Sequence, residues 1–336
     1  MNQLKRLTES LLDPRSPAYS LRPEVVEMTA ILASSQTSGI ARQKDITHRE
    51  TRTASGLAVS PTMAIMCIDD YVRTIQFIRG THAAIVAIRK RISGRPVRIL
   101  YAGCGPYATL AVPLMTIFSP NEATFSILDV HPESIASAKS IVDTLGFADS
   151  VAGFATADAG SYKVGTDWPP DIILMEIMNV CLKSEPQVAV TRHLLRQAPQ
   201  AILVPEEIRV DLTLVNPSRE FDPDCLEQER AANSRDRIPV ASVFVVNRET
   251  VHSWGDQCSE RLPASAVQMP AFPEHRYEPM LFTVIRIYED HVLKDYDSGL
   301  TCPRPLSIEG AIKPGDTIRF HYELGSHPRL HYTLEP

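Results

Sequence analysis

Four short apolar runs between residues 97 and 205 constrain the fold of this chain more than any other feature. Each run is nearly continuous rather than alternating: VRILYAG, TFSILDV, DIILMEI and AILVP. Runs of this kind are typical of parallel strands that are buried on both faces of a sheet. An amphipathic helical segment, PESIASAKSIVDTLGF, lies between two of them and ends at Gly146. This repetition of strand and helix predicts a doubly wound parallel sheet.

The chain before the first run, residues 1–95, predicts helices. In PEVVEMTAILAS, apolar residues recur at helical spacing behind Pro23, a residue that suits the first turn of a helix. Residues 62–92 predict a long helical stretch that is broken near Gly80. The polar stretch 34–56 between these helices predicts a mobile loop or lid.

The pattern changes after Pro205. Four β-rich segments follow, and one of them, RVDLTLV, alternates apolar and polar residues as a half-exposed antiparallel strand does. The polar segment 217–237 interrupts this region and predicts a helical excursion. We therefore expect three parts: a helical segment and cofactor lid at 1–95, an α/β domain at 96–205, and an all-β domain at 206–336.

Composition excludes several classes of function. The chain has 336 residues, with 44% hydrophobic and 22% charged residues, which is ordinary for a globular protein. A net charge of −6 without a dense Lys/Arg stripe argues against a nucleic-acid partner. The sequence contains no run of about 18 apolar residues, so we expect no membrane-spanning helix. The six cysteines form no CxxC motif, so we expect no metal site, no disulfide framework and a cytoplasmic location.

The first apolar run leads into a glycine turn. Gly103 and Gly105 would let the backbone turn tightly and approach a ligand closely. The third glycine of a dinucleotide fingerprint is replaced by Ala108, so the motif alone is weak. A plain turn between a strand and a helix is the alternative.

Two acids follow the next two strands that we expect. Asp129 ends the second run, where a carboxylate can accept both ribose hydroxyls of a nucleoside cofactor, or can cap the following helix. Asp158 lies in the loop after an expected third strand and could bind an adenine amino group or remain an ordinary loop residue. Glycine turn, ribose acid and third-strand acid are the order seen in class I S-adenosylmethionine-dependent methyltransferases. A nicotinamide enzyme would share the first two features.

Two glutamates follow the third of the four runs. Glu176 and Glu185 lie in MEIMNVCLKSE with mostly apolar residues between them. Two buried carboxylates without a cation would repel each other and take up a proton, so the pair predicts a cationic guest. A guanidinium suits them, because two carboxylates can hold it by charge-assisted, fork-like hydrogen bonds. The alternative is that one glutamate is buried by chance and the other is solvated.

These motifs resemble the protein arginine methyltransferase family. EIMNVCLKSE is similar to its double-glutamate loop, DDYVRT to its Asp-x-x-Arg-Thr element, and LLRQAPQAILVPEEIRVDLTLV to its passage into the β domain. The resemblance covers residues 60–215 well and continues loosely to GSHPRLHYTLE at the end. It implies N-terminal helices, a Rossmann-like doubly wound parallel sheet and a C-terminal antiparallel β-barrel-like domain. It also implies S-adenosyl-L-methionine as cofactor and a homodimer, with residues 217–237 as a possible dimerisation arm.

The resemblance also assigns roles to residues. Arg73 would pair with the carboxylate of the cofactor, and Asp70, one turn earlier, could orient Arg73 or hold a catalytic partner. The expected catalytic residues are Glu176, Glu185 and Asp70. The expected cofactor-binding residues are Arg73, Gly103, Gly105, Asp129 and Asp158.

The chain departs from the family pattern on the substrate side. The Tyr-Phe-x-x-Tyr element is replaced by ASGLA at 54–58, and Cys67 stands where a Met is usual. The Thr-His-Trp loop is absent, and its zone, 298–306, contains no His or Trp, while the HSW at 252–254 lies too early to replace it. A proton relay from a histidine to Asp70 is therefore not expected.

These departures favour a different guanidine as substrate, with free arginine or a related small molecule first. Three alternatives stay open: methylation of protein arginine, methylation of a carbon, oxygen or amine of another metabolite, and a non-catalytic cofactor-binding protein.

Overall fold

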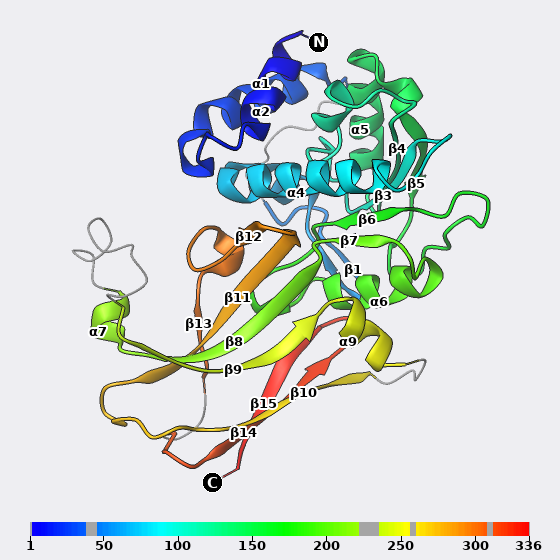
Figure 1. Cartoon of the computed structure of the whole chain (residues 1–336). Helices are drawn as coiled ribbons and strands as arrows, with labels where there is room; N and C mark the ends of the chain where they lie inside the picture. Colours follow the sequence, from blue (N-terminus) through cyan, green and yellow to red (C-terminus); the bar gives the residue numbers. More distant parts are fainter. Residues whose placement is uncertain (1, 38–45, 222–234, 256–259, 308–311, 336) are drawn as a thin grey trace.

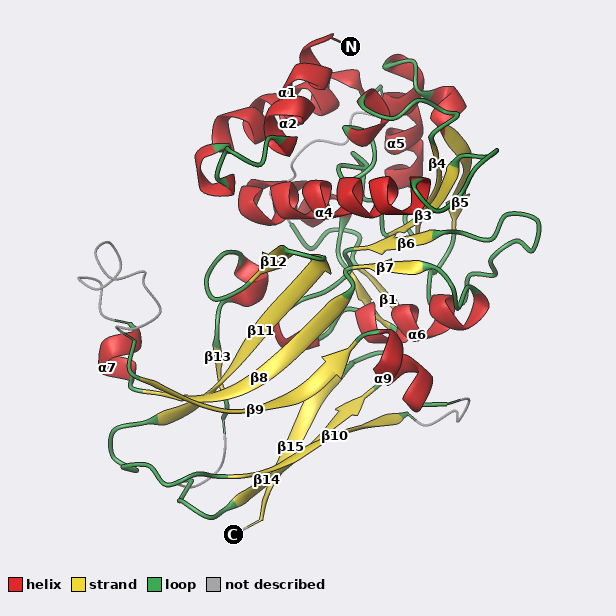
Figure 2. Ribbon diagram, viewed as in Figure 1, coloured by secondary structure: helices red, strands yellow, loops and turns green. Residues whose placement is uncertain are grey.

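The chain folds into an α/β half and an all-β half. The computed structural model describes residues 2–37, 46–221, 235–255, 260–307 and 312–335. Helices and a parallel sheet form the upper half in Figure 1, and antiparallel strands form the lower half (Figures 1 and 2). Helix α4 crosses the molecule between the N-terminal helices and the sheets.

The α/β half contains the predicted parallel sheet. Its strand order is β5-β4-β3-β6-β7 and every pairing is parallel. The strands are β3 (Val97–Ala102), β4 (Ala123–Asp129), β5 (Val151–Thr156), β6 (Ile172–Met175) and β7 (Ile202–Val204). The side chains of β3, β4, β6 and β7 are largely buried, as their apolar runs predicted, whereas those of the edge strand β5 are partly exposed. Two helices of this half, α5 (Pro132–Thr144) and α6 (Gln187–Gln197), contact β4 and β6 respectively.

The N-terminal part is helical, as predicted. Its helices are α1 (Asn2–Leu12), α2 (Arg22–Ser35), α3 (Pro61–Met66) and α4 (Tyr71–Arg89). Pro23 lies in the first turn of α2, whose buried face includes Val25, Met28 and Leu32. Helices α1 and α2 both contact α4, so this part covers one side of the sheet.

The predicted helix break near Gly80 is wrong. Helix α4 continues through Gly80, and the break lies earlier, where a 3-10 turn at Cys67–Asp69 separates α3 from α4. Gly80 serves packing instead, because a Cβ there would lie 2.3 Å from Cγ2 of Ile287 in β11. The glycine lets helix and strand approach closely, so a residue that is unfavourable for helix propensity is set by tertiary contact.

Part of the predicted lid, residues 38–45, lies outside the described residues. The rest of the 34–56 stretch contains strand β1 (Thr51–Thr53), which forms a small antiparallel hairpin with β2 (Gly56–Ala58). Leu57 N–H donates to Ser184 O at 2.8 Å, so the hairpin is joined to the loop after β6.

The all-β half consists of two antiparallel sheets. One has the order β12-β11-β8-β9 with β13 beside β11, and the other has the order β10-β14-β15. The strands are β8 (Glu207–Val215), β9 (Arg237–Val246), β10 (Arg261–Gln268), β11 (Glu278–Tyr288), β12 (His291–Leu293), β13 (Arg304–Pro305), β14 (Thr317–Glu323) and β15 (Arg329–Glu335). Two short helices, α7 (Pro217–Glu220) and α9 (Arg248–Ser253), lie beside them. Residues 222–234, most of the possible dimerisation arm, lie outside the described residues.

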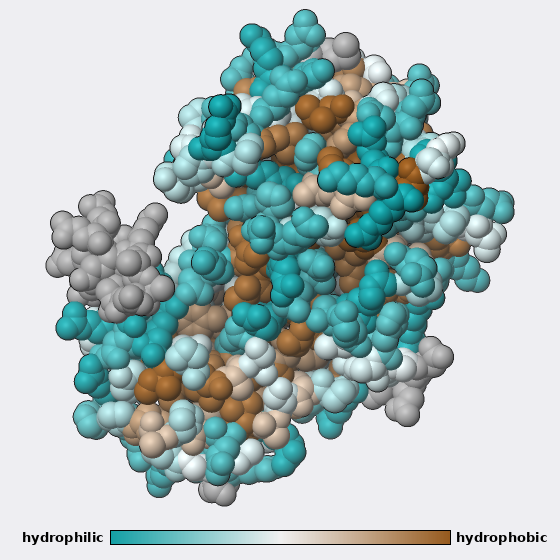
Figure 3. Space-filling view, in the orientation of Figure 1, coloured by the Kyte–Doolittle hydropathy of each residue, from teal (hydrophilic) through white to brown (hydrophobic). Residues whose placement is uncertain are grey.

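The surface drawn in Figure 3 is mainly hydrophilic, with hydrophobic groups exposed in several places, including the lower part of the all-β half. Within the described part of the chain, every helix is too short or too polar to span a bilayer. The domain boundaries expected at 95 and 205 remain predictions. They fall between α4 and β3 and between β7 and β8.

Candidate active site

A cavity of about 480 Å³ opens at the carboxyl edge of the parallel sheet. Because β3, β4, β5 and β6 are parallel, the residues that follow them meet at this edge. The register places Ala102 beside both Leu128 and Met175, so that the next residues are neighbours too. All but one of the site residues expected from the sequence line this cavity: Arg73, Gly103, Gly105, Asp129, Asp158, Glu176 and Glu185.

The turn after β3 needs glycine for two reasons. Gly103 and Gly105 have φ values of +74° and +62°, a region that side chains rarely adopt. A Cβ on Gly103 would also lie 2.1 Å from Cγ2 of Ile177, in the loop after β6. Ala108, at the third position of the fingerprint, has a positive φ of +42° as well. The backbone therefore borders the cavity directly at this turn.

Asp129 is fixed in position by its own chain. The N–H groups of Gly105 and His131 donate to its two carboxylate oxygens, each at 2.9 Å. Asp129 does not cap helix α5, whose N-cap residue is His131. The His131 ring lies 3.3 Å from Asp129 Oδ1 and 3.1 Å from Thr51 Oγ1. Burial disfavours charge on this ring, but the hydrogen bond to Asp129 outweighs it and raises the pKa of His131.

Asp158 lies in the loop after β5, as the sequence predicted. Its Oδ1 accepts the N–H of Gly160 at 2.8 Å, so the side chain shapes its own loop. A second carboxylate oxygen remains for a ligand.

Arg73 and Glu176 form an ion pair through Nη2 and Oε1. Only 11% of the Arg73 side chain and 14% of the Glu176 side chain are exposed. Burial disfavours the charge on Arg73, but Glu176 outweighs this and raises the pKa of the guanidinium. Burial raises the pKa of Glu176, and Arg73 opposes that rise. The pair joins the first turn of α4 to the end of β6.

The loop that carries Glu185 is strained and anchored to the all-β half. Three non-glycine residues in it have φ values between 54° and 72°: Cys181, Leu182 and Ser184. Backbone strain of this kind persists only where surrounding contacts impose it. Cys181 N–H donates to Thr283 Oγ1 of β11 at 3.0 Å, and the Tyr322 hydroxyl of β14 donates to Leu182 O at 2.7 Å. The antiparallel sheets thus hold the second glutamate beside the first.

The two glutamates share an electrostatic environment. Burial, together with the negative charge of Glu176, raises the pKa of Glu185 from its ordinary 4.5 to about 8, although Arg73 opposes the rise. Glu50, which also lines the cavity, acts in the same direction. At neutral pH the pair therefore holds a proton that a bound cation would displace.

The cavity lining is acidic as a whole. Its carboxylates are Glu50, Asp129, Asp158, Glu176 and Glu185, while Arg73 provides the single guanidinium among its described lining residues. No group of three or more potential metal ligands occurs among the residues that the structure describes. The lining therefore favours a positively charged organic guest.

Asp70, the remaining expected site residue, does not line the cavity. It is the N-cap residue of α4, and its Oδ2 accepts the Ser298 hydroxyl at 2.6 Å and the Gly299 N–H at 2.9 Å. Gly299 and Leu300 do line the cavity. Asp70 thus ties α4 to the 298–300 segment at the cavity wall.

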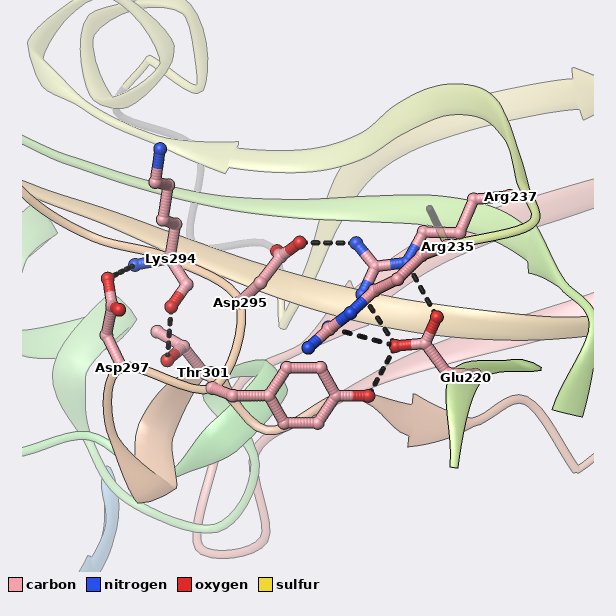
Figure 4. A network of polar contacts seen from close by, with 8 residues as sticks. Glu220, Arg235, Arg237, Lys294, Asp295, Asp297 and Thr301 are labelled. Atoms are coloured by element: carbon pink, nitrogen blue, oxygen red, sulfur yellow. Dashed lines mark hydrogen bonds and ion pairs between the residues drawn. The ribbon is translucent and has the colours of Figure 1, made fainter. Parts of the chain in front are cut away.

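A network of ion pairs and hydrogen bonds around Glu220 holds the turn that leads to Ser298 (Figure 4). The Glu220 side chain is fully buried and accepts Arg237 Nη2 at 2.6 Å, Arg235 Nη1 at 3.3 Å and the Tyr296 hydroxyl. Arg237 also pairs with Asp295. Burial would raise the pKa of Glu220, but these hydrogen bonds outweigh it and lower the pKa. The network fixes the start of the Asp295–Thr301 turn on the all-β half.

Cys67 and the HSW motif at 252–254, which the sequence also singled out, differ in their position relative to the cavity. Cys67 lines the cavity, and burial raises the pKa of its thiol to about 11, so the thiol is neutral near neutral pH. His252 and Trp254 do not line the cavity, and Trp254 stacks on Phe244 instead. Glu50 and His131, which also line the cavity, were not expected from the sequence. Only the position of His131 in LDVHP, two residues after Asp129, carries a local signal.

A solved structure has a similar fold. A chain of the Trypanosoma brucei PRMT1 enzyme-prozyme heterotetrameric complex with AdoHcy superimposes with a TM-score of 0.52 at 11% sequence identity. The similarity covers 82% of this chain and 99% of that chain. No family model and no curated protein matches the sequence. The similarity confirms the predicted architecture, a divergent form of the protein arginine methyltransferase fold, and at this identity it concerns the fold alone.

Proposed function

We propose that this protein is an S-adenosylmethionine-dependent N-methyltransferase that acts on the guanidino group of free arginine or a related small molecule. One observation carries the proposal: Glu176 and Glu185, two buried carboxylates, line the same cavity as the glycine turn and Asp129. Their two negative charges outnumber the one positive charge beside them, that of Arg73, and this imbalance contributes to the raised pKa of Glu185. A planar cation between them would relieve it.

The residues at the sheet edge suit S-adenosylmethionine. Gly103 and Gly105 bring bare backbone to the cavity wall, and Asp129 retains lone pairs for ribose hydroxyls after accepting its two N–H groups. Asp158 offers an acceptor for the adenine amino group, and Arg73 offers a guanidinium for the amino-acid carboxylate. When bound, the cofactor supplies an electrophilic methyl group on a sulfonium.

The chain's own carboxylates then prepare the acceptor nitrogen. Glu176 and Glu185 hold the guanidinium by charge-assisted hydrogen bonds and draw positive charge toward the nitrogens they contact. The third nitrogen keeps more lone-pair character and serves as the nucleophile. The methylated nitrogen must lose one proton, and Glu185, which gives up its own proton when the guanidinium binds, is the carboxylate placed to accept it. Positioning and preorganised charge supply most of the acceleration.

Asp70 takes a positioning role in this proposal. Its contacts with Ser298 and Gly299 hold the 298–300 segment at the cavity wall. Asp70 also lies three residues before Arg73 on α4 and contributes to raising the pKa of that guanidinium.

The proposal extends to assembly and location. We expect a homodimer, with 217–237 as the possible dimerisation arm predicted from the sequence; the similar solved structure is itself an oligomeric complex. The four cysteines within the described residues are free, which fits a cytoplasmic protein.

The test is methyl transfer from labelled S-adenosylmethionine to a panel of acceptors. The panel contains arginine, an arginine-rich peptide, and small amines and alcohols without a guanidine. Mass spectrometry of the products should show one methyl group in place of one hydrogen on a guanidine nitrogen of arginine.

The outcomes separate the alternatives. Methylation of the peptide alone would move the substrate to protein arginine. Methylation of an amine or alcohol alone would replace the guanidine assignment. Calorimetric binding of the cofactor without any methylated product would favour a non-catalytic cofactor-binding protein.

A further inference from the structure

A second cavity lies on the other side of the double-glutamate loop. Its volume is about 790 Å³, and strands β13 and β15 of the all-β half form much of its wall. Asn179 lines both cavities. Ser184 lines the second cavity and the next residue, Glu185, lines the first, and adjacent Cα atoms are only about 3.8 Å apart. The two cavities therefore adjoin along residues 179–185.

The second cavity has the opposite charge to the first. Lys183, Arg304 and Arg329 line it together with His331, and no carboxylate occurs among its described lining residues. This is contrary to the net charge of −6 on the whole chain. Because the described lining residues include no acid to neutralise this cluster, its positive potential is available to an anionic ligand.

The basic side chains are not consumed by ion pairs within the described chain. Arg329 Nε donates to His331 Nε2 at 2.8 Å, and His331 in turn pairs with Glu323. Neither Lys183 nor Arg304 pairs with a carboxylate of any described residue. Both are exposed side chains at the cavity mouth.

Both charges also reach the centre of the double-glutamate loop. Burial raises the pKa of the Cys181 thiol, and the charges of Arg304 and Lys183 oppose that rise. Cys181 itself lines the second cavity. The positive charges therefore lie close to the loop whose end carries Glu185.

We propose that the second cavity binds the carboxylate of a guanidino acid whose guanidinium lies between Glu176 and Glu185. The inference rests on the proposed function and specifies its substrate as a zwitterionic small molecule of the arginine type. Opposite charges at the two ends would select a molecule with a cation at one end and an anion at the other. The same basic mouth disfavours an arginine-rich peptide, because it would place further cations beside Lys183 and Arg304.

The decisive comparison is arginine against agmatine, which keeps the guanidine and lacks the carboxylate. Initial rates with each substrate should show a kcat/KM for arginine that is about tenfold or more above that for agmatine, the usual effect of one charge-assisted hydrogen bond. In Arg304→Gln this preference should fall about tenfold, mainly through the KM for arginine. Lys183→Gln should act in the same direction.

The control is Arg6→Gln, which removes an exposed arginine from α1, a helix that lines neither cavity. It should keep the wild-type preference. Arginine binding to each variant by calorimetry, with S-adenosylhomocysteine present, provides a second readout, and circular dichroism checks the fold. An added titration with inorganic phosphate tests the source of the anion, and we expect it to compete with arginine only weakly.

Equal use of arginine and agmatine, or an unchanged preference in both variants, would overturn the carboxylate site while leaving guanidine methylation intact. Strong phosphate binding without competition by arginine would also overturn it, because the cavity would then serve a separate anion. If neither guanidine is methylated and neither binds, the proposed function fails as well.

Discussion

The two ends of the first cavity differ in how their carboxylates are satisfied. We propose that one end binds the cofactor (the cofactor end) and the other binds the methyl acceptor (the acceptor end). At the cofactor end, Asp129 and Asp158 accept N–H groups of their own chain. At the acceptor end, no described residue donates a hydrogen bond to the Glu185 carboxylate, and its pKa is raised to about 8. The cofactor end is thus preorganised by the backbone, whereas the acceptor end stores a repulsion that a cation would relieve. This difference predicts which property each substitution should change.

The largest effect is expected from Glu185→Gln. The amide keeps the size of the side chain but removes the negative charge that holds the guanidinium and the group that accepts the proton. We expect kcat to fall about 10²- to 10³-fold, the range seen when one preorganised charge-stabilising group is lost. Cofactor affinity should change little, because Glu185 lies at the acceptor end.

The measurements are single-turnover methyl transfer and calorimetry with S-adenosylhomocysteine. Glu249→Gln, an exposed carboxylate on α9, is the matched control. Normal turnover by Glu185→Gln would contradict the proposal that this carboxylate acts on the methyl acceptor.

Asp129→Asn should weaken cofactor binding more than it slows turnover. One acceptor oxygen becomes an NH₂ group that faces the donor N–H of Gly105 or His131. The loss of a charged acceptor should weaken cofactor affinity about 10- to 100-fold. At saturating cofactor, kcat should fall much less than in Glu185→Gln. Calorimetry and a melting curve measure the affinity and the accompanying loss of stability, and a variant that binds cofactor normally would contradict the assignment of this end.

Much of the cofactor end could be predicted from the sequence. The nearly continuous apolar runs define buried parallel strands, and parallel strands bring their carboxyl ends to one edge. Gly103, Gly105, Asp129 and Asp158 therefore could be grouped without coordinates. His131 was missed because its role depends on a contact with Thr51, far away in the chain.

The acceptor end was less accessible to sequence reasoning. Glu176 directly follows a strand, but the position of Glu185 depends on strained φ angles and on anchors in β11 and β14 that no local pattern reveals. The misplaced helix break has a similar origin. Gly80 looks like a helix breaker in sequence, yet its close contact with Ile287 explains it.

The pH dependence of the acceptor end provides a third prediction. A carboxyl with a raised folded-state pKa binds its proton more tightly in the folded protein. Its contribution to the free energy of unfolding is therefore full below about pH 4.5 and is lost as the pH rises towards about 8. Denaturant titrations of wild type and Glu185→Gln should diverge over this window, with the wild type losing more stability as the pH rises.

The proton held by Glu185 should be released when the substrate binds. Guanidinium binding near neutral pH should release up to about one proton, which calorimetry in two buffers of different ionisation enthalpy detects. In Glu185→Gln the release should disappear. Proton release that is the same in both proteins would assign the titration to another group and break the link between the raised pKa and the acceptor.

The smallest effect is expected from Ser298→Ala. The substitution removes the hydroxyl that donates to Asp70 but keeps the Gly299 N–H on the same oxygen. If Asp70 positions the cavity wall, we expect about 1 kcal/mol lower stability and a change in kcat of a few-fold at most. If Asp70 relayed a proton through Ser298, kcat would fall steeply and its pH profile would shift. Rates from about pH 6 to 9 for wild type and Ser298→Ala decide between these roles. Ser298→Thr, which restores the hydroxyl, checks that any effect comes from the loss of that group. A small effect would leave Glu185 as the group at the acceptor end that transfers the proton. Asp70 would then act only by holding the 298–300 segment at the cavity wall.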